Sequence, residues 1–254
     1  MKNTTASIFR TLFASSAALL ALSSVLNAET VLLFEDFSGD GATSLAGKTP
    51  ETVASGLTGT TWEASGSFFR DGGIDIGNRT AFLGLGDFIN DQKGDSDAIF
   101  EVSATIDPLA GGGNWIAVGF YNGAVSVGQS GVDNAMGVFL FRDNGEGDGY
   151  FDGSIVRDDV ATGLTGAQTY GVTLDLSTWD GSTNFGSLTY TIAGIQSAAY
   201  SLTSDFDFAA VGFGTPTSGD GLASDFTLTQ IPEVGAYSLF LGLVSLGVIV
   251  RRRK

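Results

Sequence analysis

The loop at residues 142–152, which reads RDNGEGDGYFD, carries oxygen-bearing side chains at the spacing of a calcium-binding loop. The candidate ligands are Asn144, Glu146, Asp148 and Asp152, with Gly149 allowing the sharp turn. The twelfth position is Ile155, where such a loop needs a bidentate acid, and the segments 136–142 and 149–156 read as strands. The sequence therefore favours a solvent-exposed hairpin tip, with calcium as the alternative and no other cofactor indicated.

A second group of residues suggests a sugar-binding surface. If Ile116, Val118 and Phe120 face the core, Trp115 and Tyr121 share the opposite face of the same strand. The residues between these two aromatics on that face are Ala117 and Gly119. Small residues between two aromatic rings would form a shallow platform on which a sugar ring could stack. The alternative is that this strand and its neighbour at residues 137–141 are covered on both faces.

A third group, Asp95, Asp97 and Glu101, carries the carboxylates that a glycosidase would need. In a strand, Asp95 and Asp97 would lie on one face about 6.6 Å apart, within the range of paired catalytic carboxylates. Glu101 would then be about 13 Å from Asp97, too far to cooperate with it. Catalysis is therefore an alternative and not the prediction.

The composition excludes several classes of site. The chain has no cysteine and no histidine, so zinc sites built on those residues, a Ser-His-Asp triad and a Cys-His pair cannot form. Of its 12 Lys and Arg and 28 Asp and Glu, six cations and Glu233 lie in the end segments, which leaves 6 cations against 27 acids, a net charge of −21, in residues 29–230. Such a body repels nucleic acid and anionic lipid, and no nucleic-acid partner is expected.

The elements that would position these residues are β-strands. Apolar and polar residues alternate with a period of two in the runs 100–106, 170–176 and 188–192. Glycine accounts for 37 of the 254 residues, and segments rich in turn-forming residues, for example 179–184, lie between such runs. The pattern predicts an all-β fold in which residues 29–230 form one antiparallel β-sandwich, specifically a jelly roll.

The N-terminal segment has the layout of a secretory signal. Residues 1–10 carry Lys2 and Arg10 and no acid, and residues 11–22 are mostly apolar and small. A polar, small-residue stretch follows and ends at Ala28, after which cleavage is expected. An uncleaved N-terminal helix is the alternative.

The C-terminal segment predicts a transmembrane helix over Val234–Val250. This run is 17 residues long and contains no charge, at the lower end of the roughly 17–25 residues that span a bilayer. The cluster that follows it is Arg251, Arg252, Arg253 and Lys254. Four cations should hold this end on the cytoplasmic side and leave the rest of the chain outside.

Pro232 and Glu233 stand directly before this apolar run. With the helix and the basic cluster they make residues 231–254 similar to the PEP-CTERM sorting tail of exported proteins in Gram-negative bacteria. The resemblance implies recognition by an exosortase in the inner membrane, removal of the helix, and release toward the cell surface or extracellular polysaccharide. The chain departs from the usual pattern at Val234, where a second proline is common, and an uncut anchor is the alternative.

The middle of the chain resembles the laminin-G or concanavalin-A-like sandwiches. The similarity lies in the opening segment 31–37, VLLFEDF, and in the closing segments 206–214 and 223–230. In those folds the first and last strands are neighbours, which implies that residues 31–37 lie beside the exit to the tail.

The sequence thus predicts an exported, non-catalytic protein of the cell surface or extracellular matrix that binds a glycan or another surface polymer. Two alternatives stay open: a secreted polysaccharide-cleaving enzyme and a purely structural acidic matrix protein. Binding that depends on Trp115 or Tyr121 would separate the first interpretation from the last.

Overall fold

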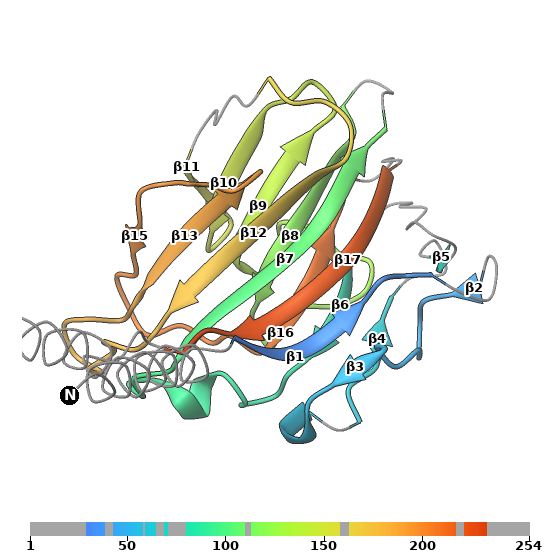
Figure 1. Cartoon of the computed structure of the whole chain (residues 1–254). Helices are drawn as coiled ribbons and strands as arrows, with labels where there is room; N and C mark the ends of the chain where they lie inside the picture. The colour runs from blue at the N-terminus through green and yellow to red at the C-terminus, as the bar shows by residue number, and fades with distance from the viewer. Residues whose placement is uncertain are drawn as a thin grey trace, which may run out of the picture. The chain divides into compact units, whose positions relative to one another are not determined.

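Alternating apolar and polar residues produce strands that assemble into two sheets (Figure 1). The computed structural model describes residues 29–38, 43–57, 59–64, 69–70, 80–109, 113–157, 163–216 and 221–232. The predicted signal segment 1–28, Glu233, the apolar run 234–250 and the basic residues 251–254 lie outside the described residues. Within the described residues, no helix is both long and apolar enough to cross a membrane. The compact unit is Val31–Gln230.

The larger sheet has eight strands. They are β1 (Thr30–Glu35), β3 (Thr52–Val53), β7 (Ile99–Pro108), β12 (Gln168–Asp175), β13 (Ser187–Ile192), β14 (Ile195–Gln196), β15 (Tyr200–Ser201) and β17 (Gly221–Gln230). Their order is β14-β13-β12-β7-β17-β1-β3, and β15 pairs with β13. The last strand therefore lies beside the first, as the sandwich resemblance implied.

The second sheet has seven strands. They are β4 (Trp62–Glu63), β6 (Thr80–Gly84), β8 (Trp115–Tyr121), β9 (Ala135–Arg142), β10 (Gly147–Phe151), β11 (Ser154–Arg157) and β16 (Ala210–Gly214). Their order is β11-β10-β9-β8-β16-β6-β4. Two short strands, β2 (Thr43–Ser44) and β5 (Phe69–Arg70), pair with each other, and two short 3-10 helices cover Ser55–Leu57 and Asn90–Gln92.

The core fills the space between the two sheets. Along β7, buried residues alternate with half-buried ones over the whole strand, because one face meets the core and the other meets solvent. The registers of β7 with β12 and of β12 with β13 are antiparallel and continuous, for example Val102 opposite Val172 and Val172 opposite Tyr190. The prediction of an all-β antiparallel sandwich is confirmed.

An aromatic cluster in the core connects the two sheets. Trp62 lies 5.8 Å from Phe37, 6.0 Å from Phe213 and 5.2 Å from Phe226, measured between ring centroids. All four side chains are buried; Trp62 and Phe213 belong to one sheet, Phe226 belongs to the other, and Phe37 follows the end of β1. The cluster therefore connects β4 and β16 to β17 and to the end of β1.

The predicted turn at 179–184 is closed by one carboxylate. Asp180 accepts hydrogen bonds from the backbone N–H groups of Ser182, Thr183 and Asn184 at 2.8, 2.8 and 3.0 Å. These bonds, that of Asn184 foremost, hold the pKa of the Asp180 carboxyl well below its usual range. Asp180 thus closes the turn, as expected of an aspartate that is followed by Gly, Ser, Thr and Asn.

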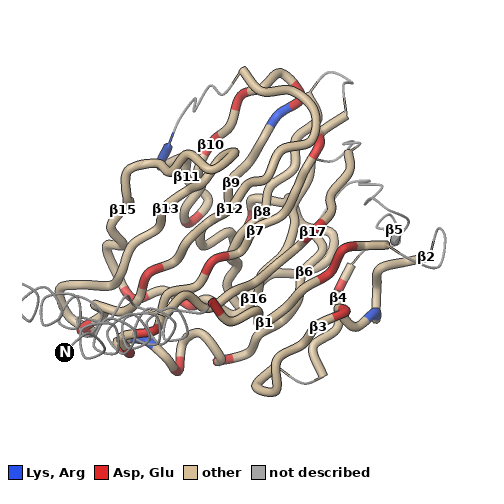
Figure 2. Tube along the Cα trace, in the orientation of Figure 1, with Lys and Arg blue, Asp and Glu red and all other residues tan. Residues whose placement is uncertain are grey.

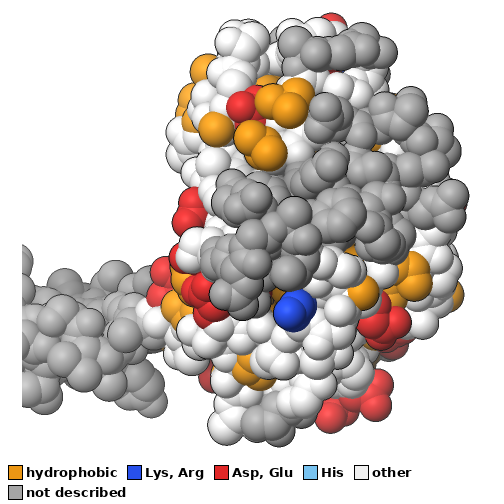
Figure 3. All heavy atoms as spheres, turned by 90° about the vertical axis from the view of Figure 1, so that its right-hand side faces the viewer, with side chains coloured by type: hydrophobic (Ala, Val, Ile, Leu, Met, Phe, Trp, Pro, Cys, Tyr) orange, Lys and Arg blue, Asp and Glu red, His pale blue; other side chains and the backbone are white. Residues whose placement is uncertain are grey.

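Acidic residues are spread over strands and turns of the described tube (Figure 2). On the side of the molecule drawn in Figure 3, acidic side chains gather in several places, and hydrophobic ones surround one of them near the top. Several cations have partners: Lys93 bonds to Asp205 at 2.6 Å, and Arg157 donates to the carbonyls of Ala198 and Ala199. Because residues 29–230 hold 6 cations against 27 acids, most of the acidic side chains cannot pair with a cation of the protein.

Candidate functional site

The outer face of the seven-stranded sheet carries a second apolar cluster, separate from the core. On β8, Ile116, Val118 and Phe120 belong to the core, as predicted from the sequence. The residues of the outer cluster are Phe82, Ala117, Tyr121, Ala135, Val138, Leu140 and Ala210, with Trp115, Val125, Val132 and Tyr150 packed against them. Trp115 and Tyr121 therefore do share one face of β8.

Tyr121, however, is covered. Its side chain is fully buried, and its hydroxyl donates a hydrogen bond to the carbonyl of Gly131 at 2.9 Å. Burial also raises the pKa of this tyrosine far above its usual value. Gly131 lies in the segment between β8 and β9, from which Val125 and Val132 also pack on the outer cluster. The alternative of a covered strand thus holds at Tyr121, which offers no ring face to a ligand, whereas Trp115 is only half-buried.

Trp115 lies beside an ion pair. It is directly opposite Arg142 in the β8–β9 ladder, and Asp148 is opposite Leu140 in the β9–β10 ladder. Nη2 of Arg142 is 2.5 Å from a carboxylate oxygen of Asp148, and the exposed fractions of the two side chains are 28% and 2%. Partial burial alone would lower the pKa of Arg142, but the hydrogen bond and charge of Asp148 outweigh it and raise the pKa.

Tyr150 completes this group on β10. It is opposite Val138 and packs against the outer cluster, so Trp115, Arg142, Asp148 and Tyr150 lie on one face. Two half-buried aromatic side chains thus flank a charged pair on a surface that is otherwise apolar and contains small residues. Such a surface can stack a ring, and the guanidinium N–H groups that do not contact Asp148 can donate hydrogen bonds to the hydroxyl groups of that ring.

The four predicted calcium ligands make different contacts in the structure. Asn144 and Glu146 bond to each other across the hairpin tip, at 2.8 Å and 3.0 Å. Asp148 pairs with Arg142, and Asp152 is exposed in the following turn with a φ of 47°. The structure therefore shows a hairpin between β9 and β10, as the sequence favoured. Among the described residues, Glu146, Asp148 and Asp152 do not form a group of acids close enough to share one ion.

The carboxylates considered for catalysis are also dispersed. Asp95 and Asp97 are exposed and lie in the turns before β7, so the spacing expected for a strand does not apply to them. Glu101 is on β7 and accepts a hydrogen bond from the hydroxyl of Thr173 at 3.2 Å. The three side chains do not share one strand face.

The structure brings together another acidic group that the sequence reasoning missed. Carboxylate oxygens of Glu35, Asp36 and Glu51 lie within 4.8 Å of one another. Glu35 is fully buried and accepts the N–H of Phe37 at 3.0 Å, while Asp36 accepts the N–H of Ser38 at 2.6 Å. Each of the three takes part in further interactions within the protein.

This acidic group has the oxygen donors that a hard divalent cation would use. The signal available in the sequence was the adjacent pair Glu35-Asp36 in the opening strand. Glu51 is brought to that pair by the register of β3 on β1, in which Phe34 is opposite Thr52. Nothing in the sequence pattern fixes that register.

Comparison with known proteins gives only remote structural similarities. No family model matches the chain, and no curated protein matches it. Similar solved structures include a Trypanosoma rangeli sialidase in complex with sialic acid (11% identity, TM-score 0.48, 78% of this chain and 30% of that one). Others are the carbohydrate recognition domain of Emp46p (12%, 0.40, 67% and 85%) and the CBM2 module of the evolved Dit of Lactobacillus casei BL23 phage J-1 (10%, 0.45, 81% and 97%).

The chain spans less than a third of the sialidase. At these identities and TM-scores, the similarities say nothing about the ligand or activity of this chain.

Proposed function

We propose that this protein is a non-catalytic binding module for an extracellular glycan, in a sandwich of the laminin-G or concanavalin-like kind. The ligand lies on the outer face of the seven-stranded sheet, where Trp115 stacks on a sugar ring and Arg142, held by Asp148, donates hydrogen bonds to its hydroxyls. The observation that carries the proposal is the juxtaposition of a half-buried tryptophan with this ion pair. The sequence had placed Trp115 in the candidate sugar-binding surface and Asp148 in the candidate calcium loop, and the structure puts both on one face of the sheet.

The charge balance narrows the ligand class. The net charge of the whole chain is −16, so a polyanionic polymer would be repelled from the protein. An uncharged polysaccharide fits this face better, because the local cation Arg142 is already paired with Asp148.

Export and sorting belong to the same proposal and rest on the sequence alone. The signal segment 1–28 would direct secretion, and Pro232, Glu233, the apolar run and the basic end would serve an exosortase-type protease. We expect the intact mass of the released protein from its native host to lack both the first 28 residues and the helix after Glu233. Released protein that retains residues 251–254 would contradict the sorting part.

The binding part is tested by replacing Trp115. We expect the wild-type chain to be retarded in native gels that contain a neutral β-glucan or the host's own extracellular polysaccharide. Trp115→Ala should reduce the apparent affinity by about twofold to tenfold, because the stacking contribution of one aromatic ring is about 0.5–1.5 kcal/mol beyond its buried area.

Trp179→Ala is the matched control, since Trp179 is also half-buried and lies in a turn of the chain remote from Trp115 in sequence. Its retardation should equal that of the wild type. Equal losses in the two variants, or no retardation of the wild type in any of these gels, would refute glycan binding through Trp115.

A further inference from the structure

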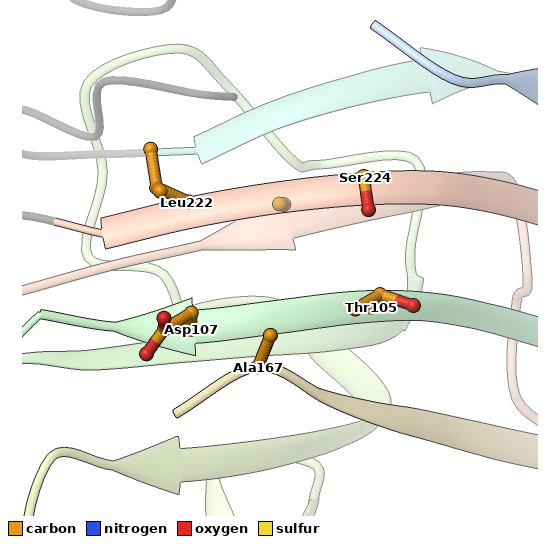
Figure 4. Close-up of a pocket in the computed structure, with 6 residues that line it drawn as sticks. Thr105, Asp107, Ala167, Leu222 and Ser224 are labelled. Carbon is orange, nitrogen blue, oxygen red and sulfur yellow. The ribbon is translucent and has the colours of Figure 1, made fainter. Parts of the chain in front are cut away.

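A shallow groove lies on the outer face of the eight-stranded sheet (Figure 4). Trp115 belongs to the other sheet. Its volume is about 190 Å³, and it is lined by Thr105, Asp107, Ala167, Leu222, Ala223 and Ser224. The β7–β17 register places Asp107 opposite Leu222 and Thr105 opposite Ser224. Two ladder pairs therefore form one continuous lining, with Ala167 on the side of β12.

Among the described residues that line the groove, the only charged group is the carboxylate of Asp107. It is half-buried, and within the described residues it makes no hydrogen bond or ion pair. The polar neighbours have partners of their own: Thr105 lies 3.2 Å from the Thr169 hydroxyl, and Ser224 donates to Asp225 at 2.8 Å. Asp107 is therefore an acceptor with both oxygens available to an incoming donor.

The electrostatic surroundings strengthen the preference for a cationic ligand. Asp225, the partner of Ser224, adds a second carboxylate next to the groove, and none of the described lining residues is a lysine or an arginine. The body of the chain is itself acidic, so nearby charges raise the local concentration of cations and lower that of anions.

The size and shape of the groove also limit which ligand it can bind. The groove is smaller than the roughly 300–1,000 Å³ that encloses a whole drug-sized ligand, and it is open along the sheet. It can hold one ring of a polymer whose remaining units continue over the surface. Leu222, 43% exposed, supplies an apolar wall against which the face of such a ring can pack.

We propose that this groove is a second binding site, independent of the face around Trp115 and specific for an amine-bearing sugar unit of an extended polysaccharide. The ammonium group pairs with Asp107, the hydroxyls of Thr105 and Ser224 bond to the ring hydroxyls, and Leu222 covers its apolar face. Charge complementarity selects the amine form over the N-acetylated form, which has nearly the same shape but no charge.

The test is a calorimetric titration of the full-length chain with a hexamer of glucosamine and with a hexamer of N-acetylglucosamine. We expect the amine hexamer to bind at least about tenfold more tightly than the N-acetylated one, with an affinity that falls as salt rises. Asp107→Asn, which keeps the shape of the side chain, should weaken binding of the amine hexamer about tenfold. Asp95→Asn removes an equal charge from an exposed turn and should leave binding unchanged.

Equal binding of the two hexamers, an unchanged affinity of Asp107→Asn, or the same loss in both aspartate variants would overturn the proposal. The last outcome would mean attraction to the acidic surface in general. Trp115→Ala should bind the amine hexamer as the wild type does, because Trp115 is on the other sheet. The two binding sites can therefore fail or succeed independently.

Discussion

Trp62→Ala is expected to lower the free energy of unfolding by about 3–5 kcal/mol, the range seen when a large aromatic side chain is removed from a core. Trp62 is 1% exposed and contacts the rings of Phe37, Phe213 and Phe226. The substitution leaves a cavity where elements of both sheets meet. Urea denaturation monitored by circular dichroism measures the change.

Trp62→Phe is the control for this experiment. The indole N–H of Trp62 is buried and has no hydrogen-bond partner among the described residues, so phenylalanine removes an unsatisfied polar group while keeping an aromatic ring. We expect a loss of less than about 2 kcal/mol. A Phe variant as unstable as the Ala variant would show that ring contacts do not account for the effect.

Gly212→Ala should destabilise the protein by about 3 kcal/mol, through overlap and not through a cavity. Gly212 is on β16, opposite Phe82 of β6 and Gly119 of β8. A Cβ atom at this position would lie 2.1 Å from the carbonyl oxygen of Ala81 and 2.7 Å from the Cα of Phe82. Both are backbone atoms of β6, so the strands themselves would have to separate.

Gly84→Ala provides the comparison on the neighbouring strand. An added Cβ there meets no atom within 4 Å, and we expect its free energy of unfolding to change by less than about 1 kcal/mol. Thermal unfolding of the two variants, measured under the same conditions, compares their stabilities. A similar decrease in both would mean that strand glycines matter here for their flexibility and not for the close approach of β16 to β6.

The strands and their inward faces were predictable because they are local properties. Phe100, Val102 and Ile106 are buried as the alternating pattern indicated, and the turn at Asp180 follows from turn-forming residues that are adjacent in the chain. The outward direction of Trp115 followed from the same period of two. The hairpin tip at Asn144 was likewise indicated by its flanking strands.

What the pattern could not show is what meets the outward faces. Tyr121 lies on the face of β8 that points away from the core, yet it is buried and bonds to Gly131 of the segment between β8 and β9. Asp148 belongs to a loop-like motif in the sequence, but the β9–β10 ladder turns its carboxylate to Arg142. The acidic group around Glu35 depends on the register of a two-residue strand. Each of these contacts depends on pairing between segments, which a single sequence leaves open.

The position of β17 determines when folding can finish. β17 is the last strand of the domain, yet it lies between β7 and β1 in the larger sheet. Until residues 221–230 are available, β1 and β3 have no ladder to the remaining strands of that sheet. Closing a loop of nearly the whole domain costs entropy before the pairing compensates for it, which slows folding. When the chain is made from its N-terminus, the larger sheet therefore stays incomplete until its final strand has been synthesised.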